Sequence, residues 1–333
     1  MRVRTPPRSA SAERRRPDSP DTALHVPGRP PRYLVTGGRG FIGAHTVRRL
    51  VLSGCEVHAT TRKPPPIGAA EVRWWQADLA DGAATHHIVD QVRPDVVIHL
   101  ASRAEGPRDL DLVVPMLNDN VLSVINIMAA ATRIPGCRVV VAGSVEEHGD
   151  QGRGAGVRSP YAASKVAATT YATLFRDVGD LPVVVLRLAM VYGPGDPHGR
   201  RLMPYVIDSL LRGVEPALSS GLRHVDWVYV DDVVDALLAA AIEPSAVGQV
   251  LDIGTGQPMR IRDAVGLICD VIGTSTRPAF GRIPDRRGEC DLIADPGPAE
   301  HHLKWRAQIG LREGVERTVA WHARGIAGAA LSA

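Results

Sequence analysis

Short apolar runs alternate with stretches of helical periodicity over the first two thirds of the chain. Runs rich in valine, leucine and aromatic residues predict buried strands at 33–36, 56–60, 72–76, 95–100, 138–142 and 182–188. The spacing of apolar positions between them predicts helices over 41–53, 84–92, 114–132 and 160–175. Parallel strands need crossover helices, so this alternation predicts an α/β fold, a Rossmann-type doubly wound parallel sheet covered by helices on both faces.

The pattern loosens beyond Gly193-Pro194-Gly195. Helices are predicted near 200–212, 232–242, 260–273 and 311–323, and short strands near 226–230 and 249–253. We therefore expect a Rossmann domain over 32–195 and a smaller C-terminal α/β lobe over 196–330. The strand and helix near 225–255 are expected to return to the Rossmann domain.

Charge is unevenly distributed along the 333 residues, which carry a formal net charge of +3. Residues 1–32 contain eight arginines and three acidic residues, a net charge of +5, so the remaining chain has a net charge of −2. The basic character belongs to the N-terminal segment, which argues against a nucleic-acid-binding face on the folded part. Residues 1–31 are rich in proline and lack apolar periodicity, and we expect them to be a disordered basic leader.

Several classes of protein are disfavoured by what the sequence lacks. Its apolar runs fall short of the roughly 18–20 residues of a membrane helix. No apolar segment follows Arg14-Arg15-Arg16 as it would in a secretory signal. The four cysteines lack CxxC spacing and indicate neither a disulfide framework nor a metal site. We expect a cytoplasmic protein that binds no membrane and no metal.

A glycine-rich turn lies between the first predicted strand and the first predicted helix. Gly38, Gly40 and Gly43 satisfy the spacing G-x-G-x-x-G, and Gly37 adds a second three-residue spacing. Glycines at these positions allow a tight turn whose backbone N–H groups approach a pyrophosphate at a helix N-terminus. The position of the turn predicts a dinucleotide-binding site.

The end of the second strand bears on the choice of dinucleotide. A site for NAD places an acidic residue about 20 residues after the glycine turn, where it binds the ribose 2′-hydroxyl. Residues 59–63 contain no carboxylate, whereas the guanidinium of Arg62 suits a 2′-phosphate. We therefore expect NADP(H) rather than NAD(H). A solvated loop arginine is the alternative interpretation of Arg62.

A tyrosine and a lysine stand four residues apart at the start of the long helix after Pro160. Tyr161 and Lys165 are therefore expected on one helical face. A cation beside a phenol favours the phenolate and lowers a pKa that starts near ~10, which suits proton transfer near neutral pH. A chance pair is the alternative, but the chain has only three lysines, Lys63, Lys165 and Lys304.

With further motifs, these residues resemble the extended short-chain dehydrogenase/reductase family, in its sugar-nucleotide branch of NAD-dependent epimerases, dehydratases and ketoreductases. The motifs are TGGRGFIG at 36–43, Asp78-Leu79, His99–Ala101, Ser144, YAASK at 161–165, Leu186-Arg187 and Val191–Pro194. The resemblance implies that Tyr161 is the catalytic acid/base, that Lys165 contacts the nicotinamide ribose and tunes Tyr161, and that Ser144 holds the substrate oxygen. The predicted cofactor contacts, with Asp78 on the adenine, are Gly37, Arg39, Gly40, Phe41, Ile42, Gly43, Arg62, Asp78, Leu79, Leu100, Ala101 and Lys165.

The segment around Ser144 bears on the reaction. Related 4,6-dehydratases often carry Asp and then Glu after the hydroxyl residue, whereas this chain has Val145 and Glu146, so Glu146 alone keeps that option open. The segment G-S-V-E-E resembles reductases of 4-keto-6-deoxy sugar nucleotides, with His148 where tyrosine is usual. Glu146 and His148 are therefore candidate accessory residues.

A net reductase commonly consumes NADPH, which agrees with the prediction of NADP(H) from Arg62. We predict NADPH-dependent reduction of the C4 ketone of a dTDP- or GDP-linked 4-keto-6-deoxy sugar, with Tyr161 as proton donor. Such a reaction would supply deoxysugars for a natural product such as an antibiotic. An NAD-dependent nucleotide-sugar 4-epimerase or 4,6-dehydratase is the alternative.

The C-terminal lobe is expected to bind the nucleoside diphosphate of a nucleotide sugar. Arg286 matches the arginine of the family's R-x-G-[DE] motif, and guanidinium groups suit phosphate. A second arginine of the family is replaced here by Val225, with Arg223 two residues earlier as a candidate substitute. The predicted substrate contacts are Arg286, Arg223, Ser144 and Tyr161.

The resemblance also suggests a homodimer through the helices near 115–131 and 160–177. Alanine-rich faces on these helices would allow close packing, through Ala129–Ala131, Ala162, Ala163, Ala167 and Ala168. Two non-enzymatic alternatives remain. One is a Rossmann redox sensor, which would typically lose the tyrosine and lysine. The other is an interaction protein that acts through its basic tail.

Overall fold

The computed structural model describes residues 26, 28–66, 70–104, 108–149, 157, 159–196, 201–286 and 289–331. Its central sheet has seven strands in the order β10-β6-β5-β4-β1-β2-β3, and all of their pairings are parallel. The strands are β1 (Arg32–Thr36), β2 (Glu56–Thr61), β3 (Val72–Gln76), β4 (Val96–His99), β5 (Arg138–Ser144), β6 (Val183–Leu188) and β10 (Val250–Ile253). The predicted Rossmann-type doubly wound sheet is confirmed.

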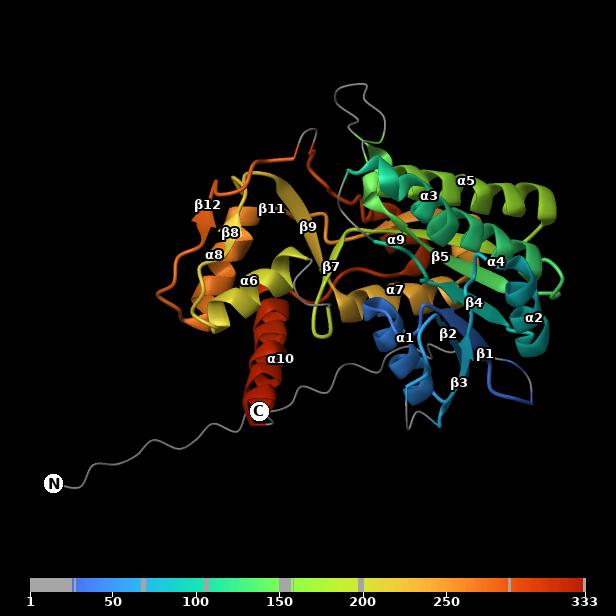
Figure 1. The fold of residues 1–333 in the computed structure, drawn as a ribbon. Helices are drawn as coiled ribbons and strands as arrows, with labels where there is room; N and C mark the ends of the chain where they lie inside the picture. Colours follow the sequence, from blue (N-terminus) through green and yellow to red (C-terminus); the bar gives the residue numbers. More distant parts are fainter. Residues whose placement is uncertain are drawn as a thin grey trace.

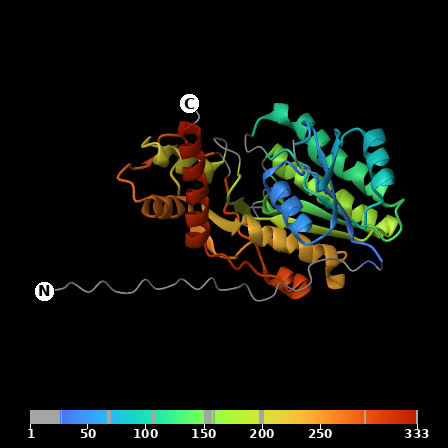
Figure 2. The same cartoon turned by 90° about the horizontal axis from the view of Figure 1, so that it is seen from below.

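Helices cover both faces of this sheet (Figures 1 and 2). One face carries α2 (Gly82–Val92), α4 (Ser123–Ala131) and α5 (Pro160–Gly179), and the other carries α1 (Phe41–Leu52) and α7 (Val230–Ile242). Alternate strand residues point to opposite faces because side chains in a strand have a period of two. Leu34, Val97, Val139, Val141 and Val183 thus pack under α2, α4 and α5. The residues between them, among them Tyr33, Val35, Val96, Ile98 and Val140, pack on the other side.

A smaller lobe follows β6. It contains a three-stranded sheet of β7 (Met190–Tyr192), β9 (His224–Tyr229) and β11 (Pro258–Arg260), and the pair β8 (Ala217–Leu218) and β12 (Ala279–Phe280). Its helices are α6 (Leu202–Leu211), α8 (Ile261–Ile272) and α10 (Leu311–Leu331), while α9 (Gly297–Leu303) and the 3₁₀ turn η4 (Pro244–Ala246) lie beside β10 and α7. Strand β10 and helix α7 before it pack in the large sheet and on its face. The strand near 226–230 instead pairs with β7 and β11.

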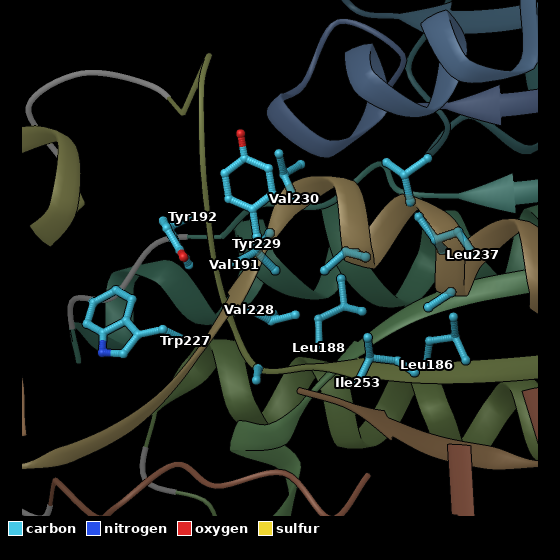
Figure 3. Close-up of a cluster of buried hydrophobic side chains, with 14 of the residues drawn as sticks. Leu186, Leu188, Val191, Tyr192, Trp227, Val228, Tyr229, Val230, Leu237 and Ile253 are labelled. Carbon is cyan, nitrogen blue, oxygen red and sulfur yellow. The ribbon is translucent and has the colours of Figure 1, made fainter. Parts of the chain in front are cut away.

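One continuous core joins the lobe to the large sheet. Figure 3 shows Leu186 and Leu188 of β6 beside Val228 of β9 and Leu237 of α7, and all four are buried. At the lobe end, the ring of Tyr192 makes edge contacts with Trp227 and Tyr229, with centroids 6.2 and 5.6 Å apart. Since close-packed interiors transmit strain rather than yield, this core holds the lobe in place against the sheet.

The helical stretch before β5 is less regular than the apolar spacing predicts. It consists of a 3₁₀ turn η1 (Leu110–Leu112), α3 (Val113–Met116), a π-helical segment η2 (Leu117–Leu122) and α4. By length and hydropathy Leu110–Ala131 could cross a membrane, with a mean hydropathy of 1.5 and 39% of the window buried. It lies against α5 along one side (Figure 1), which is the setting of an outer helix of a Rossmann fold.

The ordered chain begins before residue 32. The sequence predicts disorder through residue 31, but the Arg29 guanidinium pairs with both carboxylate oxygens of Asp95 at 2.7 and 2.8 Å. The carbonyl of Pro31 accepts a hydrogen bond from the N–H of Glu56 at 3.0 Å. The prediction is therefore wrong for residues 28–31, and residues 1–25 and 27 lie outside the described residues.

Candidate active site

The predicted site residues lie along the carboxyl ends of the strands of the large sheet. The strand order reverses between β1 and β4, because the chain proceeds to β2 and β3 on one side and to β5, β6 and β10 on the other. In open α/β sheets the crevice at such a switch point is where ligands bind. The glycine turn follows β1, and Leu100-Ala101 follows β4.

The glycine turn is shaped by contacts that exclude a side chain. Gly37 has a φ of +66°, and a Cβ there would lie 2.9 Å from backbone atoms of Ala101. A Cβ on Gly43 would lie 2.2 Å from the Gly37 carbonyl oxygen. Helix α1 begins after Gly40 without a side-chain cap, so its first N–H groups are free of intrahelical partners and face an anion site. The turn therefore fits the pyrophosphate of a dinucleotide.

The ends of β3 and β4 complete this side of the crevice. Asp78 follows β3 in an exposed turn, where its carboxylate accepts from the N–H of Ala80 at 3.0 Å. The hydroxyl of Thr36 accepts from the N–H groups of Leu100 and Ala101 at 3.0 and 3.1 Å. That hydroxyl also lies 3.0 Å from Nδ1 of His99, which is fully buried. The predicted cofactor residues on β1, β3 and β4 are thus held at one edge of the sheet, and their binding roles stay predictions.

Arg62 lies at the end of β2, where the ribose specificity was expected. Its guanidinium reaches both oxygens of Asp119 on η2, at 3.2 and 3.1 Å, with 58% of its side chain exposed. Asp119 also pairs with Arg103 at 2.8 Å. The Thr61 hydroxyl is bonded to the backbone of Lys63. Arg62 and Arg103 thus share one carboxylate, which leaves a net positive charge beside the end of β2.

Tyr161 and Lys165 project from the first turns of α5. Ser159 caps this helix by accepting from the N–H of Ala162 at 3.0 Å, and Pro160 occupies its first position. The Lys165 ammonium lies 5.8 Å from the centre of the Tyr161 ring and donates to the carbonyl of Ala142 on β5 at 2.8 Å. Burial lowers the pKa of Lys165 to about 8, although the Glu147 carboxylate opposes the shift.

Ser144 ends β5, the strand against which helix α5 with Tyr161 packs. The sequence predicted that the Lys165 cation lowers the pKa of Tyr161, but the folded chain raises it. Burial raises the pKa of Tyr161 and the negative charge of Glu146 raises it further, whereas Ser144 and the charge of Arg201 act in the opposite direction. The prediction counted the nearby cation but not the loss of water, which disfavours the phenolate.

Glu146 lies where the two parts of the molecule meet. Its carboxylate accepts from the Ser159 hydroxyl at 3.5 Å, and burial raises its pKa. The positive charges of Arg223 and Arg286, from the lobe, act in the opposite direction on the same carboxylate. The buried Nε of Arg223 has no hydrogen-bond partner among the described residues, and an unpaired buried donor suits an incoming phosphate.

Three residues behind the site were not predicted from the sequence: Asn120, Glu147 and Asp252. Asn120 on η2 is buried and bonds the backbone of Arg103 and the Ser164 hydroxyl on α5. Glu147 accepts from the N–H of Ser144 and pairs with Arg187. Asp252 lies 2.7 Å from His148, a candidate accessory residue. Of the three, Asp252 alone carried a signal in the sequence, a charged residue inside an apolar run.

The family profile of the NAD dependent epimerase/dehydratase family matches residues 33–254, about two thirds of the chain. The chain belongs to this family. The match includes the glycine turn, Ser144, Tyr161 and Lys165, and it ends at the carboxyl end of β10. An enzyme that depends on a nicotinamide dinucleotide is thereby established, without a preference for NADP.

Members of the family with assigned reactions are similar over nearly their whole length. The UDP-glucose 4-epimerase of Mycolicibacterium smegmatis is 32% identical, over 86% of this chain and 97% of the relative. A probable dTDP-glucose 4,6-dehydratase of Sinorhizobium fredii is 28% identical, over 87% and 92%. The UDP-glucose 4-epimerase of Thermotoga maritima, solved with UDP-glucose, superimposes with a TM-score of 0.82 at 26% identity, covering 89% and 99%. These relatives favour the epimerase or dehydratase alternative over the predicted reductase.

Proposed function

We propose that the chain is a nucleotide-sugar 4-epimerase acting on a UDP- or dTDP-linked hexose. The observation that carries the proposal is the grouping of Tyr161, Lys165 and Ser144 at the sheet edge that also bears the glycine turn. Position 145, where a 4,6-dehydratase often has an acid, holds a valine that is 3% exposed. Epimerisation at C4 requires only one proton-transfer group and a hydride acceptor, which suits this set better than dehydration.

In this reaction Tyr161 takes the proton from the C4 hydroxyl and later returns it to O4. A nicotinamide dinucleotide held at the glycine turn would supply the acceptor and donor of the C4 hydride. Ser144 donates to O4 and holds it beside the phenol, while the Lys165 cation stabilises the phenolate. Arg223 and Arg286 would hold the diphosphate, so that the sugar can turn over while the nucleotide stays bound.

A second candidate is the NADPH-dependent 4-ketoreductase. It is favoured by the absence of a carboxylate at Thr61 and by the basic loops beside it. Arg39 of the glycine turn donates to the carbonyl of Pro64, so the loops that bear Arg39, Arg62 and Lys63 adjoin. Against it, the family description names NAD, and the UDP-glucose 4-epimerase of Thermus thermophilus, 28% identical, was solved in complex with NAD. NAD(H) is therefore the proposed cofactor.

Three parallel assays separate the candidates. The protein with added NAD is incubated with UDP-glucose, UDP-galactose and dTDP-glucose, and products are resolved by NMR. Interconversion of C4 epimers without net change in NADH supports the proposal, whereas a 4-keto-6-deoxy product indicates the dehydratase. The third assay supplies NADPH with a 4-keto-6-deoxy sugar nucleotide. Stoichiometric oxidation of NADPH there, with no epimerisation elsewhere, would replace the proposal by the reductase.

We also propose that the enzyme acts in the cytoplasm as a homodimer. Of the alanines expected at the interface, Ala130, Ala131, Ala162 and Ala168 are each at most 3% exposed and pack inside the protomer. Ala163 is exposed, and Ala129 and Ala167 are half-buried. A different apolar face on α3 and α5 remains exposed. It comprises Val113, Val114, Leu117, Tyr171, Leu174 and Val178.

A further inference from the structure

Four ionisable side chains form a closed ring behind the turn that follows β5. Oε1 of Glu147 accepts from the backbone N–H of Ser144 at 2.7 Å, and its Oε2 lies 3.2 Å from Nε of Arg187. Nη1 of Arg187 lies 3.9 Å from Oδ1 of Asp252. Nε2 of His148 donates to Oδ2 of the same carboxylate at 2.7 Å. Because Glu147 and His148 are neighbours in the chain, the ring closes on itself.

The register of the sheet brings these side chains together. Arg187 on β6 pairs with Gly143 on β5 and with Asp252 on β10. The side chains of Glu147 and Asp252 are 2% and 7% exposed. Burying a carboxylate is costly unless it is paired and hydrogen-bonded, and well-packed apolar residues would stabilise this edge as well. Two buried carboxylates on one arginine therefore need a reason beyond stability.

Gly143 makes room for the ring. A Cβ at this position would lie 2.6 Å from Oε1 of Glu147 and 3.3 Å from Cγ of Arg187. Gly143 has an ordinary extended conformation, since it is not among the glycines with positive φ. A small residue is thus required here by the carboxylate that folds back onto Ser144 and not by the backbone.

The ring acts on the turn that carries the reacting groups. The turn is the 3₁₀ segment η3 (Val145–His148), and Ser144 caps it by accepting from the N–H of Glu146 at 3.2 Å. The ring holds this turn at both of its ends, at Ser144 through Glu147 and at His148 through Asp252. Helix α5, which bears Tyr161, packs against both β5 and this turn.

We propose that Glu147, Arg187, Asp252 and His148 are positioning residues that fix Ser144 against Tyr161 for the transfer at C4. The proposal rests on the proposed function. It assigns His148 to the support of the turn and not to proton relay or substrate binding. Misplacement of a reacting group by about 1 Å can cost roughly 100-fold in rate, so loss of the ring should lower kcat by a larger factor than it raises KM.

The test compares variants in the full chain with bound cofactor. Glu147→Ala and His148→Leu open the ring, and His148→Gln keeps a donor for Asp252. Arg138→Met is the control, because Arg138 sits at the opposite end of β5 and donates to the carbonyls of Ala240 and Glu243. We expect kcat to fall roughly 10- to 100-fold in Glu147→Ala and His148→Leu, to recover most of its value in His148→Gln, and to stay unchanged in the control. Gly143→Ala should match Glu147→Ala, and the double variant should lose no more than either.

Hydrogen–deuterium exchange of the amides of residues 144–149 gives a readout that needs no substrate. It should be faster in Glu147→Ala and His148→Leu and unchanged in the control. Faster exchange with an unchanged kcat would show that the ring is only structural. A fall in kcat that is equal in His148→Gln and His148→Leu would indicate that His148 relays protons. If the wild type turns over no nucleotide sugar, the proposed function fails. Unchanged exchange in Glu147→Ala would show separately that the ring does not hold the turn.

Discussion

At the scale of single residues, the proposed chemistry depends on the positive charge of Lys165. The ammonium is buried, its pKa is lowered to about 8, and it is bonded to one carbonyl and faces the Tyr161 ring. Tyr161→Phe removes the proton-transfer group, and Lys165→Met removes the cation that stabilises the phenolate. We expect each to lower kcat by about 10²- to 10⁴-fold, the usual contribution of a positioned acid/base.

The control for both variants is the affinity for NADH, measured by the change in cofactor fluorescence. Tyr161→Phe should bind NADH as the wild type does, because the glycine turn is untouched. Turnover by Tyr161→Phe within tenfold of the wild type would exclude the proposed role of the phenol.

The titration of His99 makes the free energy of unfolding depend on pH. Burial lowers its pKa to about 3, whereas the unfolded imidazole titrates near ~6.5. The unfolded chain therefore binds the extra proton first, so the stability conferred by neutral His99 is present above about pH 6.5 and declines as pH falls toward 3. The decline should approach about 1.4 kcal/mol per pH unit.

We expect His99→Asn to flatten this dependence, since its amide oxygen still accepts from Thr36 but cannot be protonated in this range. Urea unfolding of both proteins between pH 4 and 8 measures the difference. If the unfolding free energies of the wild type and of His99→Asn fall in parallel as the pH decreases, His99 does not cause the loss of stability in acid.

Site residues that belong to a sequence motif were predictable, whereas the residues that hold them in place were not. The spacing of Tyr161 and Lys165 follows from helix geometry, and the glycine turn from the needs of a phosphate. The partners of Glu147 are 40 residues away at Arg187, and those of His148 are 104 residues away at Asp252. Such pairs depend on the strand order, which local periodicity does not contain. The raised pKa of Tyr161 was missed for the same reason, since burial is a property of the folded site.

At the scale of elements, the π-helical segment η2 is the feature that apolar spacing could not predict. The segment sits between α3 and α4 and places Asn120 where its side chain ties the loop after β4 to α5. The apolar positions of residues 114–132 fit an ordinary helix, and the extra residue of a π-turn leaves no trace in so short a pattern. Strands β7, β8, β11 and β12 were missed because runs of two or three residues carry no period.

Asn120→Ala should destabilise this junction. Its amide makes four hydrogen bonds, to the backbone N–H and carbonyl of Arg103 and to the hydroxyls of Ser102 and Ser164. Partners left unsatisfied in the interior cost about 1–3 kcal/mol. We expect a loss of unfolding free energy in that range by urea denaturation, and almost none for Asn118→Ala, an exposed asparagine in the same segment. Equal effects of the two variants would contradict a specific role for Asn120.

At the scale of the whole molecule, the parallel sheet covered by helices followed from the alternation of strands and helices, but the outer surface did not. Alanines were expected at the interface, whereas the fold buries four of them, Ala130, Ala131, Ala162 and Ala168, and leaves Ala163 exposed. The exposed side chains on α3 and α5 are larger and more apolar than these alanines. Tyr171, Leu174 and Val178 recur at helical spacing on α5 and are 41%, 49% and 77% exposed. Val114 lies on α3, which contacts α5, and is 64% exposed.

An exposed apolar face of this kind marks a contact with another surface, and a second copy of the same face is the occupant that the proposed homodimer requires. Leu174→Glu and Val114→Glu place charges there and should convert a dimer into a monomer, measured by size-exclusion chromatography with light scattering. Leu52→Glu is the control, since Leu52 at the end of α1 is 73% exposed on the opposite side of the sheet. A monomeric wild type would exclude the dimer, and co-sedimentation of the wild type with lipid vesicles, lost in Leu174→Glu, would assign the face to a membrane surface instead.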